Sequence, residues 1–333
     1  MSSLSSSLIP AIYTVDQIQE VVATPGFQEE LIDGIQNGFV ALERGEFFAP
    51  PIQTLGLPPF EFVSGVDGYA AQTCIKTGYF KGQEHYVVKV ASGGFPLENS
   101  GMMQIYSQRT GKLEALLLDN GILTELRTAA VGALAAKLLG PKSIGTIGIV
   151  GTGIQAKYQL EMLSAVSPCK SVLVWGRTSS NVEAYVSEFA KKGYSISSVA
   201  SSDELLEKCD IIVTTTCSRE AILGNFLPAT TKCKLITCIG ADAPGKYELN
   251  PTIVAKADLL VADKIDQSAE RGEFQKAIAD GCILQESIVS LGKLIEQETL
   301  HRKNGDNRLI IVDSSGVALQ NCVISSLVVQ KLF

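Results

Sequence analysis

From residue 144 onward, short apolar runs alternate with segments of helical pattern. The run 144–150 is followed by the helix-compatible segment 154–163 and then by a second strand-like run, 171–175. Further runs of the same kind are CDIIVTTT (209–216), CKLITCIG (233–240), ADLLVAD (257–263) and Leu309–Val312. Strands that alternate with helices predict a parallel sheet with right-handed crossovers. We therefore expect an α/β, Rossmann-type doubly wound parallel sheet over residues 126–313.

The first 120 residues follow a different pattern. One helical face of the segment 28–44 collects apolar residues at a spacing of three to four. Strand-like runs then come in pairs separated by short polar turns, which predicts antiparallel hairpins. The pairs are Ala70–Tyr79 with Tyr86–Val90, and Met103–Ser107 with Leu113–Leu118. Thr124 is a candidate N-cap for an Ala-rich helix that ends at Gly140. We expect an N-terminal α+β domain, residues 1–125, completed by the C-terminal tail 314–333.

Composition narrows the class of protein. The 333 residues are 46% hydrophobic and 19% charged, the balance of a soluble globular protein with a large core. The net charge of -7 repels phosphate backbones, so we expect no nucleic-acid partner. No apolar run approaches the roughly 18 residues of a membrane span, so we expect no membrane partner. The first basic residue is Arg44, so we expect neither a secretory nor a mitochondrial leader and place the protein in the cytoplasm.

The eight cysteines and two histidines predict no metal site. None of the cysteines has a CxxC or other zinc-ligand spacing, and several lie in apolar stretches. We interpret them as buried thiols in a reducing compartment.

A dinucleotide-binding turn follows the strand-like run 144–150. The turn reads Gly151-Thr152-Gly153-Ile154-Gln155-Ala156, which fits GxGxxG/A between a strand and a helix. The first glycine permits the tight turn, the second lets a pyrophosphate approach the backbone, and Ala156 allows close helix–strand packing. The following helix offers unpaired N–H groups to the phosphates. A merely structural glycine-rich turn is the alternative.

The end of the second strand selects between NAD and NADP. An acidic residue there would bond the ribose hydroxyls of NAD, but the sequence has Arg177 and Thr178 and no acid before Glu183. A guanidinium makes charge-assisted, often bidentate bonds to phosphate oxygens. We therefore expect NADP(H) to be favoured, with NAD(H) possible; a solvated Arg177 after the strand is the alternative.

Four charged residues are candidates for the chemistry. Lys76 and Lys89 lie in neighbouring predicted strands, so both point into one cleft if the strands pair. Arg127 lies in the Ala-rich helix, and Asp242 follows the strand CKLITCIG at the sheet edge where ligands bind. The alternative interpretation is that each lysine is a surface cation and that Asp242 is a turn-forming residue beside Pro244.

Seven motifs follow one another in a fixed order between residues 87 and 321. They are VVKVASGGFPLENSG, LLDNGILTELRTAA, the GTGIQA turn, VTTT near residue 215, IGADAPGKYEL, DKIDQSAERGEF and VDSSGVALQN. In this order they resemble the ornithine cyclodeaminase/mu-crystallin family, which also includes archaeal-type alanine dehydrogenases and cyclic ketimine reductases.

The resemblance implies roles for particular residues. Lys89 and Arg127 match residues that contact the substrate, and Asp242 matches the acid/base group at the junction of nicotinamide and substrate. Thr128 matches a position near the cofactor. We also expect Thr215 of the VTTT motif to bind the cofactor. The resemblance also implies a homodimer assembled through the N-terminal domain.

Two departures from the cyclodeaminase pattern bear on the substrate. Cyclodeaminases have an arginine in their first strand where this chain has Gln53, and a glutamate that engages a distal amine where it has Lys76. A cation facing an ammonium is repelled by roughly 1–4 kcal/mol at about 4 Å. In alanine dehydrogenases the position of Lys76 carries an arginine. Lys76 therefore argues for a substrate with a carboxylate and no distal amine.

These features predict an NAD(P)H-dependent reductase or dehydrogenase of a small 2-imino or 2-amino acid, with Asp242 and Lys89 as catalytic residues. Lys76, Lys89 and Arg127 would bind the substrate's carboxylate. One alternative is a cyclodeaminase that recycles its NAD and releases ammonia. The other is a mu-crystallin-like protein that binds cofactor or ligand without turnover.

Overall fold

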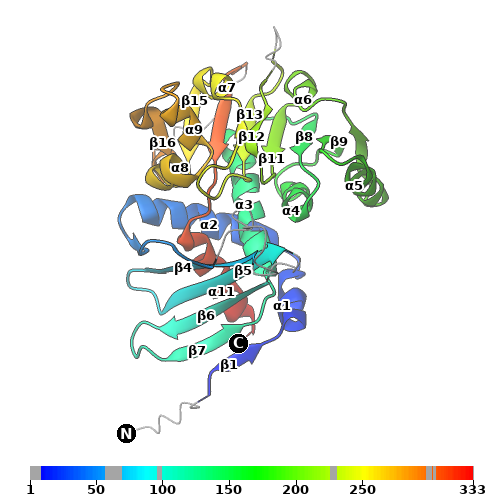
Figure 1. Ribbon diagram of the computed structural model, residues 1–333. Helices are drawn as coiled ribbons and strands as arrows, with labels where there is room; N and C mark the ends of the chain where they lie inside the picture. The colour runs from blue at the N-terminus through cyan, green and yellow to red at the C-terminus, as the bar shows by residue number, and fades with distance from the viewer. Residues whose placement is uncertain are drawn as a thin grey trace, which may run out of the picture. The chain divides into compact units, whose positions relative to one another are not determined.

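The computed structural model describes residues 9–56, 70–95, 100–225, 231–297, 302 and 305–332. The chain forms two compact units, Met1–Arg127 with Ala318–Phe333, and Thr128–Val317 (Figure 1). These boundaries lie two and four residues beyond those expected from the sequence. Within the described ranges, no helix has both the length and the apolar character that crossing a membrane requires.

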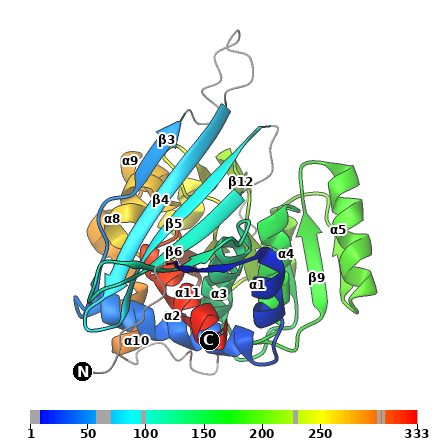
Figure 2. The same cartoon turned by 90° about the horizontal axis from the view of Figure 1, so that it is seen from below.

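The first unit contains a seven-stranded sheet in the order β1-β7-β6-β5-β4-β2, with β3 also paired to β4. Figure 2 shows β3, β4, β5 and β6 side by side. All pairs are antiparallel except β1 with β7. The strands are β1 Ala11–Tyr13, β2 Phe47–Phe48, β3 Gln53–Gly56, β4 Ala70–Phe80, β5 His85–Phe95, β6 Ser100–Ser107 and β7 Leu113–Leu117. The two hairpins predicted from the sequence are β4–β5 and β6–β7.

One face of this sheet is covered by helices. The helix α11 (Ala318–Leu332) packs against β4, β5 and α2 (Phe27–Glu43), and α1 (Val15–Val22) packs on α11 (Figure 1). The covered face carries the buried side chains of Val87, Ile105 and Leu117. Each large apolar side chain buried in this way contributes about 1.5–3 kcal/mol. The C-terminal segment therefore supplies the core that the first unit needs.

The N-cap expected at Thr124 is wrong. The helix α3 (Ile122–Leu139) begins two residues earlier, so Thr124 lies inside its first turn. The carboxylate of Asp119 accepts a hydrogen bond from the backbone N–H of Leu123 at 3.0 Å. The left-handed backbone of Asn120 (φ 48°) and Gly121 (φ 86°) turns the chain before the helix, so that the earlier acidic side chain takes the capping role.

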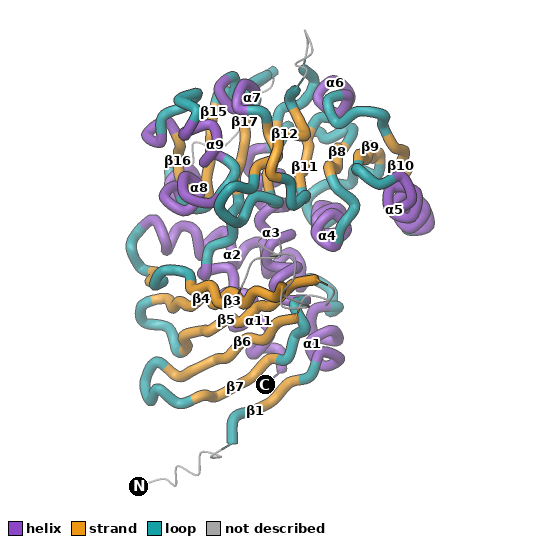
Figure 3. Tube along the Cα trace, viewed as in Figure 1, coloured by secondary structure: helices purple, strands orange, loops and turns teal. Residues whose placement is uncertain are grey.

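The second unit is built on eight parallel strands in the order β10-β9-β8-β11-β13-β17-β15-β16 (Figure 3). They are β8 Ile147–Val150, β9 Ser171–Trp175, β10 Ser195–Ser198, β11 Ile211–Thr214, β13 Leu235–Cys238, β15 Leu259–Ala262, β16 Ile288–Ser290 and β17 Ile310–Asp313. The first five follow the Rossmann order 3-2-1-4-5, which confirms the predicted fold class. The order reverses between β8 and β11.

The connections of the second unit are mostly helical. They are α4 Ile154–Leu163, α5 Ser179–Lys191, α6 Glu204–Lys208, α7 Pro251–Ala255, α8 Ile265–Arg271, α9 Phe274–Ala279 and α10 Leu291–Glu296. A two-stranded ribbon of β12 (Arg219–Leu223) and β14 (Tyr247–Leu249) was not expected from the sequence pattern.

Candidate functional site

The turn after β8 lies at the point where the strand order reverses. Gly151 has φ 108°, and a Cβ atom at this residue would lie 2.6 Å from Thr215 Oγ1. Its N–H donates to the carbonyl of Trp175 at the end of β9, at 2.8 Å. Thr215 in turn donates through its backbone N–H and its hydroxyl to the carbonyl of Val150. Only glycine satisfies both the backbone conformation and the contact with Thr215.

The second glycine of the turn faces open space. Gly153 is the N-cap of α4, and a Cβ placed on it would meet no atom within 4 Å. Ala156, one turn further, is fully buried. The first N–H groups of α4 thus lie beside an approach unobstructed by side chains, the arrangement that suits a pyrophosphate.

Thr128 lies beside the first turns of α4. Its carbonyl accepts from Gln159 Nε2 at 3.2 Å, and the same nitrogen lies 3.3 Å from Gln155 Oε1. Gly132 permits this contact, since a Cβ atom there would be only 1.9 Å from Gln159 Oε1. The structure therefore brings Thr128, Gln155 and the Gly151–Ala156 turn together within the second unit.

Arg177 and Thr178 follow β9 and are both exposed. Thr178 is the N-cap of α5, and Gly176 before Arg177 approaches Thr152, whose Cγ2 would be 3.1 Å from a Cβ there. The end of the second strand is thus adjacent to the glycine turn, as in a dinucleotide fold.

A buried glutamate joins the ends of β11 and β13. The Glu248 carboxylate accepts from Thr214 Oγ1 and the N–H of Thr216, each at 2.6 Å, and from the N–H of Gly240 at 3.0 Å. A Cβ at Gly240 would lie 2.0 Å from the Thr216 carbonyl oxygen. Glu248 therefore holds the end of β11, which lies beside Gly151, against the end of β13, which leads to Asp242.

A second buried glutamate supports the first. The Glu273 carboxylate accepts from the N–H of Glu248 at 2.9 and 3.0 Å and from that of Leu249 at 2.6 Å. Burial raises the pKa of both carboxyl groups, and the neighbouring Glu248 raises that of Glu273 further. The charge of this pair of carboxyl groups, Glu248 and Glu273, is therefore sensitive to pH.

Asp242 lies four residues after the end of β13 and is exposed. Its Oδ1 lies 2.7 Å from Lys246 Nζ, and its carbonyl accepts from Arg271 Nε at 2.9 Å. The carboxylate is therefore accessible at the carboxyl edge of the sheet, with a cation beside it.

In the first unit, Lys76 of β4 stands directly opposite Lys89 of β5. Directly opposed residues of an antiparallel pair share a face. Met103 of β6 is the next in this row, opposite Lys89, and its Sδ lies 2.8 Å from Ser325 Oγ of α11. Both lysines are buried, with 6% and 3% of their surfaces exposed. The two strands pair in this register, so both lysines lie on one side of the sheet, the side where Met103 contacts α11.

Arg127 completes this group of cations. Its guanidinium is buried, and Nη1 donates to Gln320 Oε1 of α11 at 2.6 Å. Asp119, which caps α3, is also buried; burial raises its pKa, while the N–H of Leu123 and the charge of Lys89 act in the opposite direction. The first unit therefore holds three buried cations and one buried acid on β4, β5, α3 and the segment before α3. Lys89 acts on Asp119 and Arg127 contacts α11, and such a composition suits the binding of an anion.

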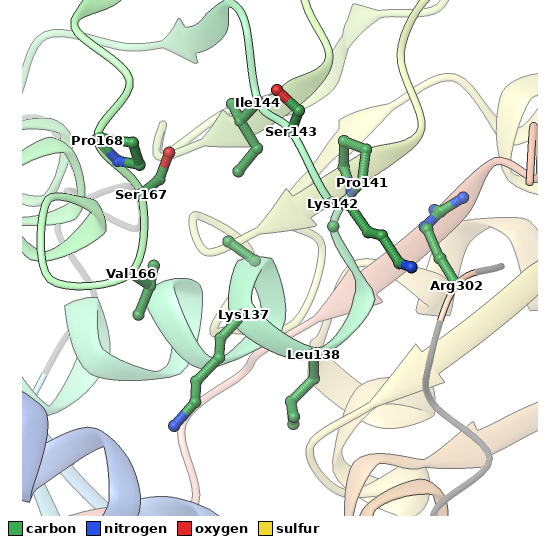
Figure 4. Close-up of a pocket in the computed structure, with 12 residues that line it drawn as sticks. Lys137, Leu138, Pro141, Lys142, Ser143, Ile144, Val166, Ser167, Pro168 and Arg302 are labelled. Carbon is green, nitrogen blue, oxygen red and sulfur yellow. The ribbon is translucent and has the colours of Figure 1, made fainter. Parts of the chain in front are cut away.

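A cavity of about 740 Å³ in the second unit is a separate feature (Figure 4). Its lining includes Lys137 and Lys142, from the end of α3 and the segment before β8, and Ser167, from the segment before β9. It therefore lies at the amino ends of these strands. The guanidinium of Arg302, also in the lining, donates to the carbonyls of Leu139 at 2.6 Å and Arg308 at 2.8 Å. This arginine links the end of α3 to the segment before β17, which is a structural role, so we do not assign the cavity to the site.

A family model matches most of the chain. The model for the ornithine cyclodeaminase/mu-crystallin family matches residues 78–333. The chain belongs to this family. The matched region includes Lys89, Arg127, the Gly151–Ala156 turn and Asp242, while Lys76 lies two residues before it.

Individual relatives within the ornithine cyclodeaminase/mu-crystallin family differ in activity. The chain is 34% identical to an uncharacterized cyclodeaminase of Sinorhizobium fredii over 293 residues, 85% of this chain and 84% of the relative. It is 28% identical to the iminosuccinate reductase of Paracoccus denitrificans over 309 residues, 91% of each. The structure of that reductase with NAD+ matches with a TM-score of 0.80 at 25% identity, over 97% and 96% of the two chains. An archaeal alanine dehydrogenase dimer with bound NAD matches with a TM-score of 0.83 at 26% identity, over 97% and 95%.

Several residues of the site were not singled out from the sequence. Asp119, Lys246, Glu248 and Gln320 lie in recognised motifs, but no role follows from their spacing. Gln320 contacts Arg127 across 193 positions of sequence. The available signal was their position inside motifs that carry the family resemblance, such as VDSSGVALQN and IGADAPGKYEL.

Proposed function

We propose that the protein is an NAD(P)H-dependent reductase or dehydrogenase of a small 2-imino or 2-amino acid. The observation that carries the proposal is the pairing of Lys76 with Lys89 on one buried face of the sheet, with Arg127 in the same unit. Ammonium and guanidinium groups make charge-assisted bonds to carboxylates. A lysine at position 76 repels a distal ammonium, which favours an acid that lacks one.

Within this proposal, each residue has a defined task. Lys89 and Arg127 bind the α-carboxylate, and Lys76 adds a third cation. The bound nicotinamide supplies the hydride donor or acceptor for the α-carbon. Asp242 stabilises the protonated imine with its negative charge and exchanges a proton with the nitrogen. Gly151–Ala156 and the start of α4 fit a dinucleotide, as the open approach beside Gly153 supports. Thr128 and Thr215 belong to the same cofactor-binding group.

A substrate panel tests the proposal. Purified protein is incubated with NADPH or NADH and with pyruvate, glyoxylate or oxaloacetate in ammonium or methylamine buffer, and separately with 1-pyrroline-2-carboxylate. We expect oxidation of the reduced cofactor with at least one of these, and a large rise in KM for the Lys89→Met variant. Absence of oxidation with every imine would contradict the proposal.

Cyclodeamination is the second candidate function. It is favoured by the similarity to the uncharacterized cyclodeaminase of Sinorhizobium fredii, which extends over most of the chain. Lys76 disfavours it, because a cyclodeaminase must hold the distal amine of a diamino acid beside this position. Release of ammonia from L-ornithine without net cofactor change would favour this candidate.

We infer that NADP(H) is preferred over NAD(H). Support comes from Arg177 and Thr178, exposed beside the glycine turn, and from the missing acid at the end of β9. Arg177→Ala should weaken NADPH binding by about 1.5–3 kcal/mol, the range for a hydrogen bond to a charged group, and leave NADH nearly unchanged. Fluorescence titration of both cofactors measures this difference; an equal loss for both would show that Arg177 does not select the phosphate.

We also propose a homodimer assembled through the first unit. The face of its sheet opposite Lys76 and Lys89 carries half-buried apolar residues such as Val88 and Leu116, and Ile12 at the sheet edge is 55% exposed. An apolar sheet face of this kind is typical of an interface. Light scattering at micromolar concentration should give twice the chain mass, and Val88→Glu should reduce it; a monomeric wild type would contradict the proposal.

A further inference from the structure

Two neighbouring amides at the start of α11 have unused hydrogen-bonding atoms. Gln320 and Asn321 are buried, with 0% and 1% of their surfaces exposed. Both side-chain atoms of Asn321, Nδ2 and Oδ1, and Nε2 of Gln320 have no hydrogen-bond partner among the described residues. Buried polar atoms of folded proteins are nearly always satisfied. An amide with neither its donor nor its acceptor satisfied therefore points to a ligand.

The contacts around Asn321 run to the segments that carry the three cations. Gln320 Oε1 accepts from Arg127 Nη1 at 2.6 Å. Cys322 Sγ donates to the carbonyl of Gly78, two residues after Lys76 in β4, at 3.2 Å.

Ser325 lies one turn after Asn321 on the same helix face and contacts Met103, the register partner of Lys89. The neighbours of Asn321 in α11 thus contact Arg127 and the strands that carry Lys76 and Lys89.

The chemistry of the amides complements that of the cations. Lysine and arginine side chains only donate hydrogen bonds, whereas an amide also accepts. A 2-amino or 2-imino acid presents carboxylate oxygens, which need donors, beside an N–H group, which needs an acceptor. The three cations serve the carboxylate alone. Asn321 Oδ1 is an unused buried acceptor in this part of the first unit.

We propose that Asn321 is a specificity-determining contact for the substrate, with Oδ1 accepting from the substrate N–H and Nδ2 donating to its carboxylate. Gln320 has a double role: its Oε1 orients Arg127, and its Nε2 donates to the same carboxylate. This inference rests on the proposed function, since it assumes that the cations bind a 2-amino or 2-imino acid.

The test combines ligand-free stability with kinetics for two probes, 1-pyrroline-2-carboxylate and pyruvate in ammonium buffer. Asn321→Leu replaces an unsatisfied buried amide with an apolar group of similar size, which costs little or stabilises. We expect an unfolding temperature equal to or above that of the wild type, with KM for the active probe raised at least tenfold. Asn321→Asp keeps an acceptor for the substrate N–H but replaces the donor to the carboxylate with a negatively charged oxygen, so it should also raise KM.

Matched variants separate binding from packing. Ser325→Ala, on the same helix face, should leave KM unchanged. Gln320→Glu keeps the acceptor for Arg127 but loses the donor, so it should raise KM; an unchanged KM would limit Gln320 to orienting Arg127 and overturn its second role.

A lowered unfolding temperature of Asn321→Leu with an unchanged KM would show a purely structural residue and overturn the proposal. Failure of the proposed function is recognised separately: the wild type would then turn over neither probe.

Discussion

Lys76 and Lys89 occupy directly opposite positions in the antiparallel ladder of β4 and β5, and both are buried. Like charges in such positions destabilise a sheet. The chain nevertheless places two ammonium groups side by side and adds the guanidinium of Arg127 in the same unit. A substrate carboxylate bound there would interact with these cations and offset the repulsion between the two lysines.

The first prediction concerns this cost. Lys76→Met removes one of the opposed charges and keeps the apolar stem, so we expect the free energy of unfolding to rise by about 0.2–1 kcal/mol. Binding of the anionic substrate should weaken about tenfold or more, the scale of a lost bond to a charged group. Chemical denaturation and KM measure the two effects.

Lys112→Met is the control for this variant, because Lys112 is exposed between β6 and β7. It should change neither quantity. A Lys76→Met protein that is less stable and binds substrate normally would mean that the lysine serves packing.

The two glycines of the turn after β8 should respond differently to alanine. Gly153→Ala adds a methyl group where no atom lies within 4 Å, so the fold should be affected by less than about 1 kcal/mol, the typical N-cap effect. The methyl group occupies the approach to the α4 N-terminus, so dinucleotide affinity should fall at least tenfold. Gly151→Ala should lose both affinity and stability, because its φ is 108° and Thr215 is too close.

Isothermal titration with NADPH and thermal unfolding of the two glycine variants check this contrast. Normal NADPH affinity of Gly153→Ala would place the pyrophosphate elsewhere.

Asp242→Asn tests the proton-transfer role. The amide keeps the shape of the side chain but cannot accept the proton or balance the charge of a protonated imine. General acid–base groups contribute about 10²–10⁴-fold, so kcat should fall by that factor while NADPH affinity stays unchanged. A variant that retains more than about a third of wild-type turnover would assign the proton to another group, with Lys89 the next candidate.

Glu273 predicts a dependence of stability on pH. Burial, and then the charge of Glu248, hold its pKa well above the ordinary value of 4.5. The folded state therefore binds more protons than the unfolded state above that pH, and the free energy of unfolding falls as pH rises, by up to about 1.4 kcal/mol per pH unit for one proton. Glu273→Gln mimics the neutral form and should flatten this slope.

Denaturation of the wild type and the variant between pH 5 and 8, above the ordinary pKa of a glutamate, measures the slope. Glu270→Gln, an exposed neighbour in α8, should leave it unchanged. A wild-type stability that rises over this interval would contradict the direction given for Glu273.

The sequence predicts local features of this protein well, for physical reasons. Gly151–Ala156 is recognisable because a strand, a turn and a helix follow one another within a few residues. The pairing of the strands that carry Lys76 and Lys89 is recognisable because only a short polar turn separates them. Contacts between distant segments carry no such signal: Arg127 and Gln320 are separated by 193 positions. The helix cap at Thr124 was predicted wrongly because the carboxylate of Asp119, three residues before Ile122, accepts from the N–H of Leu123, and the helix begins two residues before Thr124.

The central claim is that the chain reduces or oxidises a 2-imino or 2-amino acid with net turnover of cofactor. The most direct measurement is the stoichiometry of the reaction with 1-pyrroline-2-carboxylate, or with pyruvate in ammonium buffer, by quantifying NADPH and the amino acid product in the same sample. We predict one NADPH oxidised for each proline or alanine formed. Cyclic amino acid formed from L-ornithine, with one ammonia released and the cofactor unchanged, together with no NADPH oxidation by either imine, would contradict it.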